Sequence, residues 1–270
     1  MLKQRVITAL VLAPLALFGV FGLPLSSFMY LMDAVVLVAA WEWANLSGYK
    51  SQKARGLYVL AAAAVVALMH FIYSEMSVYI VLPIAVVAWS VALLWVIRFP
   101  LTSVWESRWV RGVIGVFVLI PCWVAFVGMK AAADGEMLIL LLFLLVWGAD
   151  VGAYFSGKRF GKTKLAPHVS PGKTREGLYG GLVACFVVSV AFAVFAELSV
   201  QQAVLLIILS LVTGLVSVLG DLFESMLKRH RGIKDSSQLL PGHGGVLDRI
   251  DSLTAASPLF VLGMQYMVFA

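Results

Sequence analysis

Charged residues are scarce in this sequence: they make up 13% of its 270 residues, whereas hydrophobic residues make up 62%. A typical soluble domain carries about 25% charged residues, so the composition excludes an ordinary soluble protein. Cysteine is also rare. Cys122 and Cys185 both lie within apolar runs and lack the spacing of metal ligands, so we expect small buried side chains at both positions.

Long apolar runs recur along the whole chain and leave no room for a soluble domain. A helix that crosses about 30 Å of hydrocarbon needs roughly 20 predominantly apolar residues. The sequence therefore predicts an all-α, polytopic integral membrane protein, with about nine transmembrane helices in one continuous membrane domain. The first run is taken as an uncleaved span, because no small-x-small cleavage site follows it. The expected spans are residues 6–22, 25–46, 56–73, 78–97, 109–129, 137–155, 178–198, 203–222 and 252–270.

Positive charge is distributed unevenly between the two sides that these spans define. Of the 20 Lys and Arg residues, 19 fall at the N-terminus or in the even-numbered connections, and Lys130 alone lies opposite. Because Lys and Arg concentrate in cytoplasmic loops, the N-terminus is predicted to be cytoplasmic and the C-terminus to lie on the outer side. The two long polar loops, 156–177 and 223–251, then face the cytoplasm.

Four acidic residues lie within or at the ends of the apolar runs. An ionised carboxylate at the bilayer centre costs about 2.5–3.5 kcal/mol even on lenient insertion scales. Each is therefore expected to be buried against a cation, water or another partner. The four acids are Asp33, Glu42, Asp150 and Asp221.

Acidic and basic side chains also share the spacing of a helix near the end of the eighth span. If that helix continues past the interface, one of its faces carries Asp221, Glu224, Ser225 and Lys228. Alternatively, Glu224 and Lys228 form an ordinary i,i+4 ion pair. Asp248 and Asp251 form a second i,i+3 pair just before the last span. Acids among cations at a membrane surface favour a metal–polyphosphate site, because Mg²⁺ prefers few carboxylates, several waters and phosphate oxygens.

Two Gly-Lys-Thr tripeptides, at 161–163 and 172–174, raise the question of a phosphate-binding loop. A Walker A loop needs a glycine five residues earlier, where this chain has Ser156 and Pro167. No strand–loop–helix context is expected for either tripeptide, so a P-loop is rejected. The segment HVSPGKTREG, 168–177, still offers hydroxyls, cations and backbone amides that could cradle an anion; a solvated basic loop is the alternative.

The Gly-His-Gly-Gly sequence at 242–245 gives the backbone freedom around His243. Its bare amides could approach phosphate, and the imidazole would be accessible to a ligand. Zinc is not favoured, because the four histidines and two cysteines are scattered without ligand spacing. His70 lies in a span far from these loops, and no functional role is expected for it.

The polar residues 225–251 together form a longer pattern. It reads Ser225-Met-Leu-Lys228-Arg229, Lys234-Asp235, Leu240-Pro241-Gly242-His243-Gly244-Gly245 and Asp248-Arg249-Ile250-Asp251. This pattern resembles the signature of the phosphatidate cytidylyltransferases, the CDP-diacylglycerol synthases, and departs from it nowhere. The segment 170–177 and Asp150 in GADVGAY resemble two further motifs of that family. The N-terminal spans match it only in length and hydrophobicity.

The resemblance implies a reaction in which CTP and phosphatidic acid give CDP-diacylglycerol and pyrophosphate. It also implies Mg²⁺, bound by Asp221 and Asp248, and leaves an additional monovalent cation possible. Lys228, Arg249 and His243 are expected with those two aspartates at the catalytic centre. Substrate binding is expected from Asp150, Ser170, Lys173, Thr174, Ser225, Arg229, Lys234, Asp235, Gly244, Gly245 and Asp251.

The resemblance also predicts different roles for the two halves of the chain and a set of partners. Residues 1–135 are expected to serve anchoring, packing or dimerisation, and residues 136–270 to form the catalytic half. The expected partners are CTP, phosphatidic acid and membrane lipids. A homodimer is possible, and no nucleic-acid partner is expected. The site is expected to face the cytoplasm from a bacterial cytoplasmic (inner) membrane.

Other functions remain as alternatives. Closely related ones are a CTP-dependent polyprenol kinase or another CDP-lipid synthase. A secondary transporter would also place acids and glycines inside its spans, but here the polar residues gather at one face and no inverted halves are evident. The DG-x-x-AR pattern of a CDP-alcohol phosphotransferase is missing.

Overall fold

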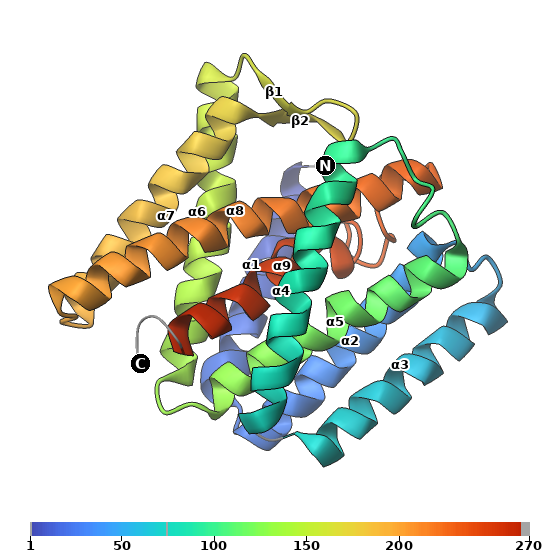
Figure 1. Ribbon diagram of the computed structural model, residues 1–270, viewed down its shortest axis with the longest axis horizontal. Coiled ribbons are helices and arrows are strands. Elements are labelled where there is room, and N and C mark those ends of the chain that lie inside the picture. The colour runs from blue at the N-terminus through green and yellow to red at the C-terminus, as the bar shows by residue number, and fades with distance from the viewer. Residues whose placement is uncertain (1, 74, 266–270) are drawn as a thin grey trace.

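A computed structural model describes residues 2–73 and 75–265 of the chain (Figure 1). Each predicted span coincides with a helix in that part, and the end of the last span, 266–270, lies outside the described residues. Seven of these helices, α2 to α8, are long and apolar enough to cross a membrane, whereas α9 has 17 residues and the apolar part of α1 is shorter still. The protein is thus an all-α membrane protein. Its helices are α1 (Leu2–Gly22), α2 (Leu25–Ser47), α3 (Gln52–Ile72), α4 (Glu75–Arg98), α5 (Arg108–Ala131), α6 (Gly135–Phe160), α7 (Arg175–Phe195), α8 (Val200–Arg231) and α9 (Leu247–Gly263).

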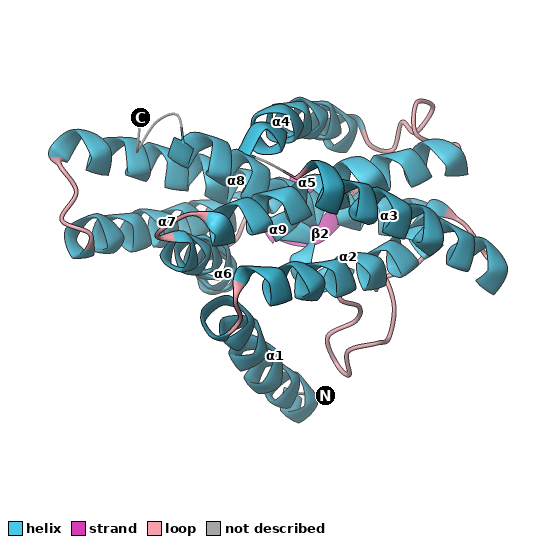
Figure 2. Ribbon diagram, turned by 90° about the horizontal axis from the view of Figure 1, so that it is seen from below, coloured by secondary structure: helices cyan, strands magenta, loops and turns pink. Residues whose placement is uncertain are grey.

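Helix α9 lies at the centre of the arrangement (Figure 1). On one side, α6 packs along α7, and α7 along α8; on the other, α5 packs against both α2 and α4. Helix α9 contacts α8 from the first group and α4 and α5 from the second. Helix α1 projects from one side of the molecule, as the lower part of Figure 2 shows, and touches α2 and α6. The first residues of α9 are therefore enclosed by helices from both halves of the chain.

Aromatic packing fixes the part of α8 that precedes its polar end. Phe223 is buried, and its ring lies 6.5 Å from that of Trp43 on α2 and 5.5 Å and 6.3 Å from those of Trp89 and Trp95 on α4. Aromatic pairs at such separations are favourable beyond their buried area. This contact holds the neighbouring Glu224 at the centre of the molecule.

Glycines allow α6 and α7 to approach closely. A Cβ at Gly152 would lie 2.5 Å from the carbonyl oxygen of Gly180, and one at Gly181 would lie 2.8 Å from that of Ala149. In a membrane, where hydrophobic burial does not drive helix association, small residues at the interface let the backbones pack. Gly152, Gly180 and Gly181 thus form a glycine seam between the two helices.

The segment 156–177 is not an irregular loop. Helix α6 continues to Phe160, and β1 (Lys164–Ala166) pairs antiparallel with β2 (Ser170–Thr174) to form a hairpin. Because β2 runs directly into α7, the expectation that no strand precedes a helix here is wrong; strands this short leave no periodic signal. The second Gly-Lys-Thr lies within the strand rather than after it, which remains incompatible with a Walker A loop.

The segment 223–251 is also more helical than its polar composition suggests. Helix α8 runs to Arg231 and ends at Gly232, which takes a left-handed conformation with a φ of 72°. This confirms that Asp221 and Lys228 share one helix beyond the apolar run. Helix α9 starts at Leu247, so Asp248 and Asp251 lie in its first two turns and not before it. The irregular part is residues 232–246, called the 232–246 loop below.

Candidate active site

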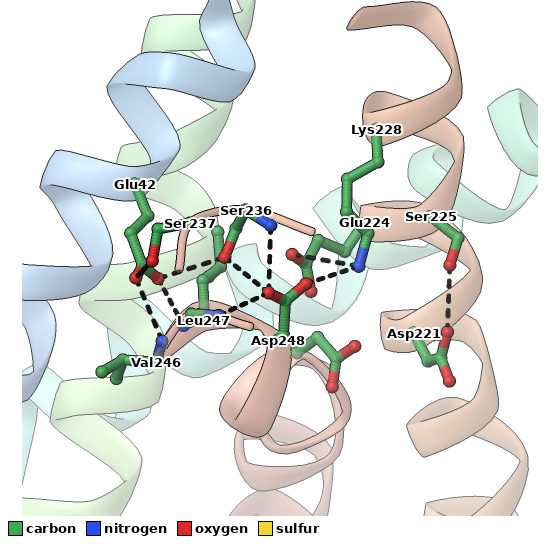
Figure 3. Close-up of polar contacts among 12 residues, drawn as sticks. Glu42, Asp221, Glu224, Ser225, Lys228, Ser236, Ser237, Val246, Leu247 and Asp248 are labelled. Carbon is green, nitrogen blue, oxygen red and sulfur yellow. Dashed lines mark hydrogen bonds and ion pairs between the residues drawn. The ribbon is translucent and has the colours of Figure 1, made fainter. Parts of the chain in front are cut away.

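The polar end of α8 faces the first turn of α9, where a buried lysine holds two carboxylates (Figure 3). The Nζ atom of Lys228 lies 2.7 Å from Oδ1 of Asp248 and 3.4 Å from Oε1 of Glu224. All three side chains are nearly inaccessible to solvent. The Glu224–Lys228 contact is therefore an ion pair, as the sequence allowed, but a buried one that Lys228 shares with α9.

The second oxygen of Asp248 is held by the 232–246 loop. Its Oδ2 accepts hydrogen bonds from the Ser236 amide at 3.0 Å, the Ser236 hydroxyl at 2.8 Å and the Gly245 amide at 2.7 Å. A carboxylate with both oxygens bonded to donors stays ionised despite burial. Asp248 is thus a fixed negative charge at the start of α9, and the amide of Gly245, a predicted phosphate contact, already serves this aspartate.

Asp221 connects α8 to the hairpin. Its Oδ2 lies 2.7 Å from Nζ of Lys173 on β2, and its Oδ1 accepts a hydrogen bond of 3.2 Å from Ser225. A second link joins the same elements, because Nε of Arg229 donates to the carbonyl oxygen of Val169 at 3.1 Å. The structure thus brings together the two polar segments that the sequence singled out.

More carboxyl groups than lysines lie around these pairs. Asp251 lies near Asp221 and shares a side-chain hydrogen bond with Glu224, and Asp150 lies near Lys173 and Asp221. The cluster therefore contains more carboxyl groups than its two lysines can pair with.

The glycines after His243 are required by packing. Gly244 has a φ of 81°, and a Cβ on it would lie 2.5 Å from Oδ2 of Asp248. A Cβ on Gly245 would collide with the side chains of Ser236 and Glu42. The sequence indicated backbone freedom at these positions, and the structure adds that a side chain would displace Asp248.

The remaining predicted residues occupy several positions around the cluster. Thr174 caps α7, with its Oγ1 accepting from the amide of Gly177 at 3.1 Å. In the part of the chain that the structure describes, Lys234, Asp235 and Ser170 have no hydrogen bond or ion pair from their side chains to the cluster. Their roles in substrate binding remain predictions.

A cavity of about 560 Å³ links the polar cluster to the apolar face of the molecule. Its polar end includes His243, Asp248, the exposed Arg249 and Asp251. Its walls are apolar side chains of α1, α2, α5 and α6, several of them exposed on the surface of those helices. The cavity can therefore hold a molecule with a charged head and an apolar body.

No three carboxylate, imidazole or thiol side chains among residues 2–73 and 75–265 are arranged to enclose a metal ion. The donors that do gather are carboxylate oxygens, which suit Mg²⁺ or Ca²⁺ rather than a softer metal. Magnesium usually keeps several waters and takes substrate phosphate oxygens. Asp221 and Asp248 stay the predicted ligands of such a shared site, and both oxygens of Asp248 already accept bonds from protein donors.

Comparison with known proteins shows the family to which the chain belongs. The family model described as the cytidylyltransferase family matches residues 3–267. The chain belongs to this family. It is 49% identical over 262 residues to a protein of Pseudomonas aeruginosa named phosphatidate cytidylyltransferase, covering 96% of each chain. A protein of the same name from Haemophilus influenzae is 40% identical over 282 residues, which is 96% of this chain and 97% of its own. One from Staphylococcus haemolyticus is 33% identical over 271 residues.

Sequence reasoning missed two side chains that hold this cytidylyltransferase-family site. Glu42 accepts hydrogen bonds from the 232–246 loop and α9, and Ser236 bridges Glu42 and Asp248. The signal for Glu42 was present, since an acid inside an apolar run predicts a partner. Nothing local identified Ser236 as that partner, because the two residues are 194 positions apart.

The other acids of the apolar runs also have partners. Asp33 on α2 lies 2.9 Å from Nε2 of His70 on α3 and accepts a hydrogen bond of 2.7 Å from the Trp123 indole on α5. His70, to which the sequence assigned no role, is thus the partner of an acid. This pair joins three helices of the N-terminal half, α2, α3 and α5.

Proposed function

We propose that this member of the cytidylyltransferase family transfers the cytidylyl group of CTP to phosphatidic acid, releasing pyrophosphate. The observation that carries the proposal is the cavity, which joins apolar walls to a buried cluster of carboxylates and cations. A lipid phosphate can enter there with its tails among helices, while a nucleotide approaches from the polar end. The names of the relatives agree with this reaction.

The reaction needs positioning and charge neutralisation more than a strong base. An oxygen of the phosphatidic acid phosphate attacks the α-phosphorus of CTP in line, the bond to the β-phosphate oxygen breaks, and pyrophosphate leaves with its electron pair. Because the nucleophile is already an anion, no strong general base is required. Lys173, Lys228, Arg229 and Arg249 supply cations at the cluster, and such groups stabilise charge that develops on phosphoryl oxygens.

Asp221 and Asp248 are the proposed ligands of a divalent cation, with Mg²⁺ preferred. When bound, the ion would neutralise part of the triphosphate charge. Their oxygens now bond to Lys173 and Lys228, which keep the two carboxylates neutralised in this arrangement. Because the cluster has more carboxyl groups than lysines and arginines, the proposal allows an additional monovalent cation beside them.

The proposal includes a topology. The basic ends of the helices, together with the hairpin and the 232–246 loop, face the cytoplasm of a bacterium, and the protein lies in the cytoplasmic (inner) membrane. This follows from the distribution of Lys and Arg. Helices α1 and α9 complete a set of nine spans, which puts the C-terminus on the outer side. A homodimer is compatible with the many apolar side chains exposed on α3 and α4.

The proposed function is tested with purified protein in detergent, phosphatidic acid, radiolabelled CTP and Mg²⁺. Label is expected to enter the lipid phase, and EDTA is expected to stop the reaction until Mg²⁺ is restored. Asp221→Asn and Asp248→Asn are each expected to lower kcat at least 100-fold, about the loss seen when one transition-state contact is removed. Lys50→Gln, at an exposed residue, serves as the control.

The outcomes separate the reaction from the residues. A wild-type protein that forms no CDP-diacylglycerol, but passes label from γ-labelled CTP to a polyprenol, is a kinase instead. If wild type is active and both aspartate variants keep its rate, the reaction stands and the proposed metal ligands are wrong.

A further inference from the structure

Glu42 is a buried carboxylate on α2, in the half of the chain to which the sequence assigned no chemistry. Its side chain is 1% exposed. One oxygen accepts hydrogen bonds from the Ser237 hydroxyl at 2.5 Å and the Val246 amide at 3.1 Å; the other accepts from the Ser236 hydroxyl at 3.3 Å and the Leu247 amide at 2.7 Å. A buried carboxylate needs such donors, and here one segment supplies all four.

Two of these donors belong to the start of α9. The first amides of a helix have no partner within it, and the helix dipole favours negative charge there. Val246, at the N-cap position, makes no side-chain capping bond of its own. Glu42 therefore supplies from α2 the cap that the local sequence lacks, and so fixes the position of the α9 N-terminus.

Ser236 connects Glu42 to Asp248. Its hydroxyl lies between the two carboxylates, 2.8 Å from Asp248 and 3.3 Å from Glu42, and its single proton can be donated fully to one of them at a time. The Ser236 amide also donates to Asp248. The residue that orients Asp248 is thus itself held by Glu42, as Figure 3 shows.

The 232–246 loop has little freedom to move away from α2. The side-chain amide of Asn45 donates to the Ser236 carbonyl oxygen at 3.3 Å, one turn along α2 from Glu42. A Cβ on Gly245 would collide with both Ser236 and Glu42. The side chains of α2 therefore determine where this loop, and with it the second oxygen of Asp248, lies.

We infer that Glu42 is a positioning residue for cytidylyl transfer. It holds Ser236 and the α9 N-terminus so that the carboxylate of Asp248 reaches Lys228, which also pairs with Glu224. The inference rests on the proposed function. It means that α2, and not the C-terminal half alone, helps to build the active site.

The test compares Glu42→Gln, which keeps the shape of the side chain but removes its charge, with Glu197→Gln at an exposed position. Turnover, KM for CTP, the Mg²⁺ concentration for half-maximal activity and the apparent melting temperature are measured. Glu42→Gln is expected to lower kcat about 10–100-fold, the range for residues that orient a metal ligand. It is also expected to raise the Mg²⁺ requirement and leave KM for CTP nearly unchanged. Glu197→Gln is expected to behave as wild type.

A second comparison distinguishes a Glu42 that positions Asp248 from a Glu42 that only caps α9. If Glu42 acts through Ser236, the double variant Glu42→Gln/Ser236→Ala loses no more activity than the slower single variant, because the two side chains form one unit. Additive losses in kcat would overturn the inference. So would a lower melting temperature with unchanged kcat and Mg²⁺ requirement, since that result describes a cap alone.

If Glu42→Gln does not fold, two neighbouring serines answer the same question. Both hydroxyls reach Glu42, but Ser236 also bonds Asp248. Ser236→Ala is expected to lower kcat at least 10-fold more than Ser237→Ala, and equal losses would overturn the inference. An inactive wild type overturns the proposed function and this inference with it, whereas an active wild type with an equally active Glu42→Gln overturns the inference alone.

Discussion

Lys228 forms ion pairs with two buried carboxylates, and this explains why a lysine is stable in the interior of the molecule. Its ammonium group lies between Glu224 on its own helix and Asp248 on α9. An ordinary i,i+4 pair on a helix surface contributes a few tenths of a kcal/mol. A buried group of this kind behaves differently, because removing one partner leaves the others unpaired away from water. The stability of the site therefore depends strongly on this residue.

Replacing Lys228 by methionine is expected to destabilise the protein by about 3–5 kcal/mol, the range for removing one partner of a buried ion pair. The measurement is equilibrium unfolding in mixed detergent micelles, with Lys50→Met, at an exposed lysine, as the control. Unfolding of Lys228→Met at the same denaturant concentration as the control would show that the buried carboxylates do not depend on this cation.

At the scale of the elements, two interfaces decide the geometry of the site. The glycine seam between α6 and α7 brings Asp150 and the hairpin to the same side as α8. The end of α8 then contacts that hairpin through Lys173 and Arg229. Because the hairpin leads directly into α7, its position follows the packing of α7 on α6. Changes in the seam should therefore affect stability and the site together.

Gly152→Ala tests the seam. The added methyl group would lie 2.5 Å from the Gly180 carbonyl oxygen, so the helices must separate, and overpacking of this kind destabilises by about 1–3 kcal/mol. Gly56→Ala on α3 is the matched control, because a Cβ there meets nothing within 4 Å. It is expected to stabilise by up to about 1 kcal/mol through helix propensity. Thermal unfolding in detergent compares the two, and equal melting temperatures would contradict close packing at Gly152.

At the scale of the whole molecule, the apolar helices and the basic ends define how the protein sits in a membrane. Seven described helices can cross it by length and composition. The exposed large apolar side chains lie along their outer faces, where lipid rather than water would surround them. The charged cluster lies where the polar end of α8 meets the first turn of α9.

Single-cysteine labelling tests this orientation. In a variant whose buried native cysteines are replaced by alanine, Lys53→Cys and Asp134→Cys place thiols at exposed positions of opposite connections. An impermeant maleimide is expected to label position 134 in intact cells and position 53 only in inside-out vesicles, because positive charge stays in the cytoplasm. The reverse pattern would invert the proposed topology.

The sequence by itself determined the helices and the family. Apolar runs become helices in a membrane because each backbone polar group must bond within its own segment, and this makes the spans a local property. The motif residues 225–251 were likewise readable as one contiguous pattern. Their family resemblance is confirmed by the match over residues 3–267. The short strands of the hairpin were missed, since they extend over only a few residues and lack periodicity.

Only the tertiary structure decided which charged groups meet. Lys173 binds Asp221 and Lys228 binds Asp248, pairings that no spacing could indicate because they join separate elements. Glu42 and Ser236 are brought together across 194 residues, since the packing of α2 beside α9 places them in contact. The physical reason is the same in each case: a helix follows from local hydrogen bonds, whereas a buried charge takes whichever partner the packing of distant helices brings within reach.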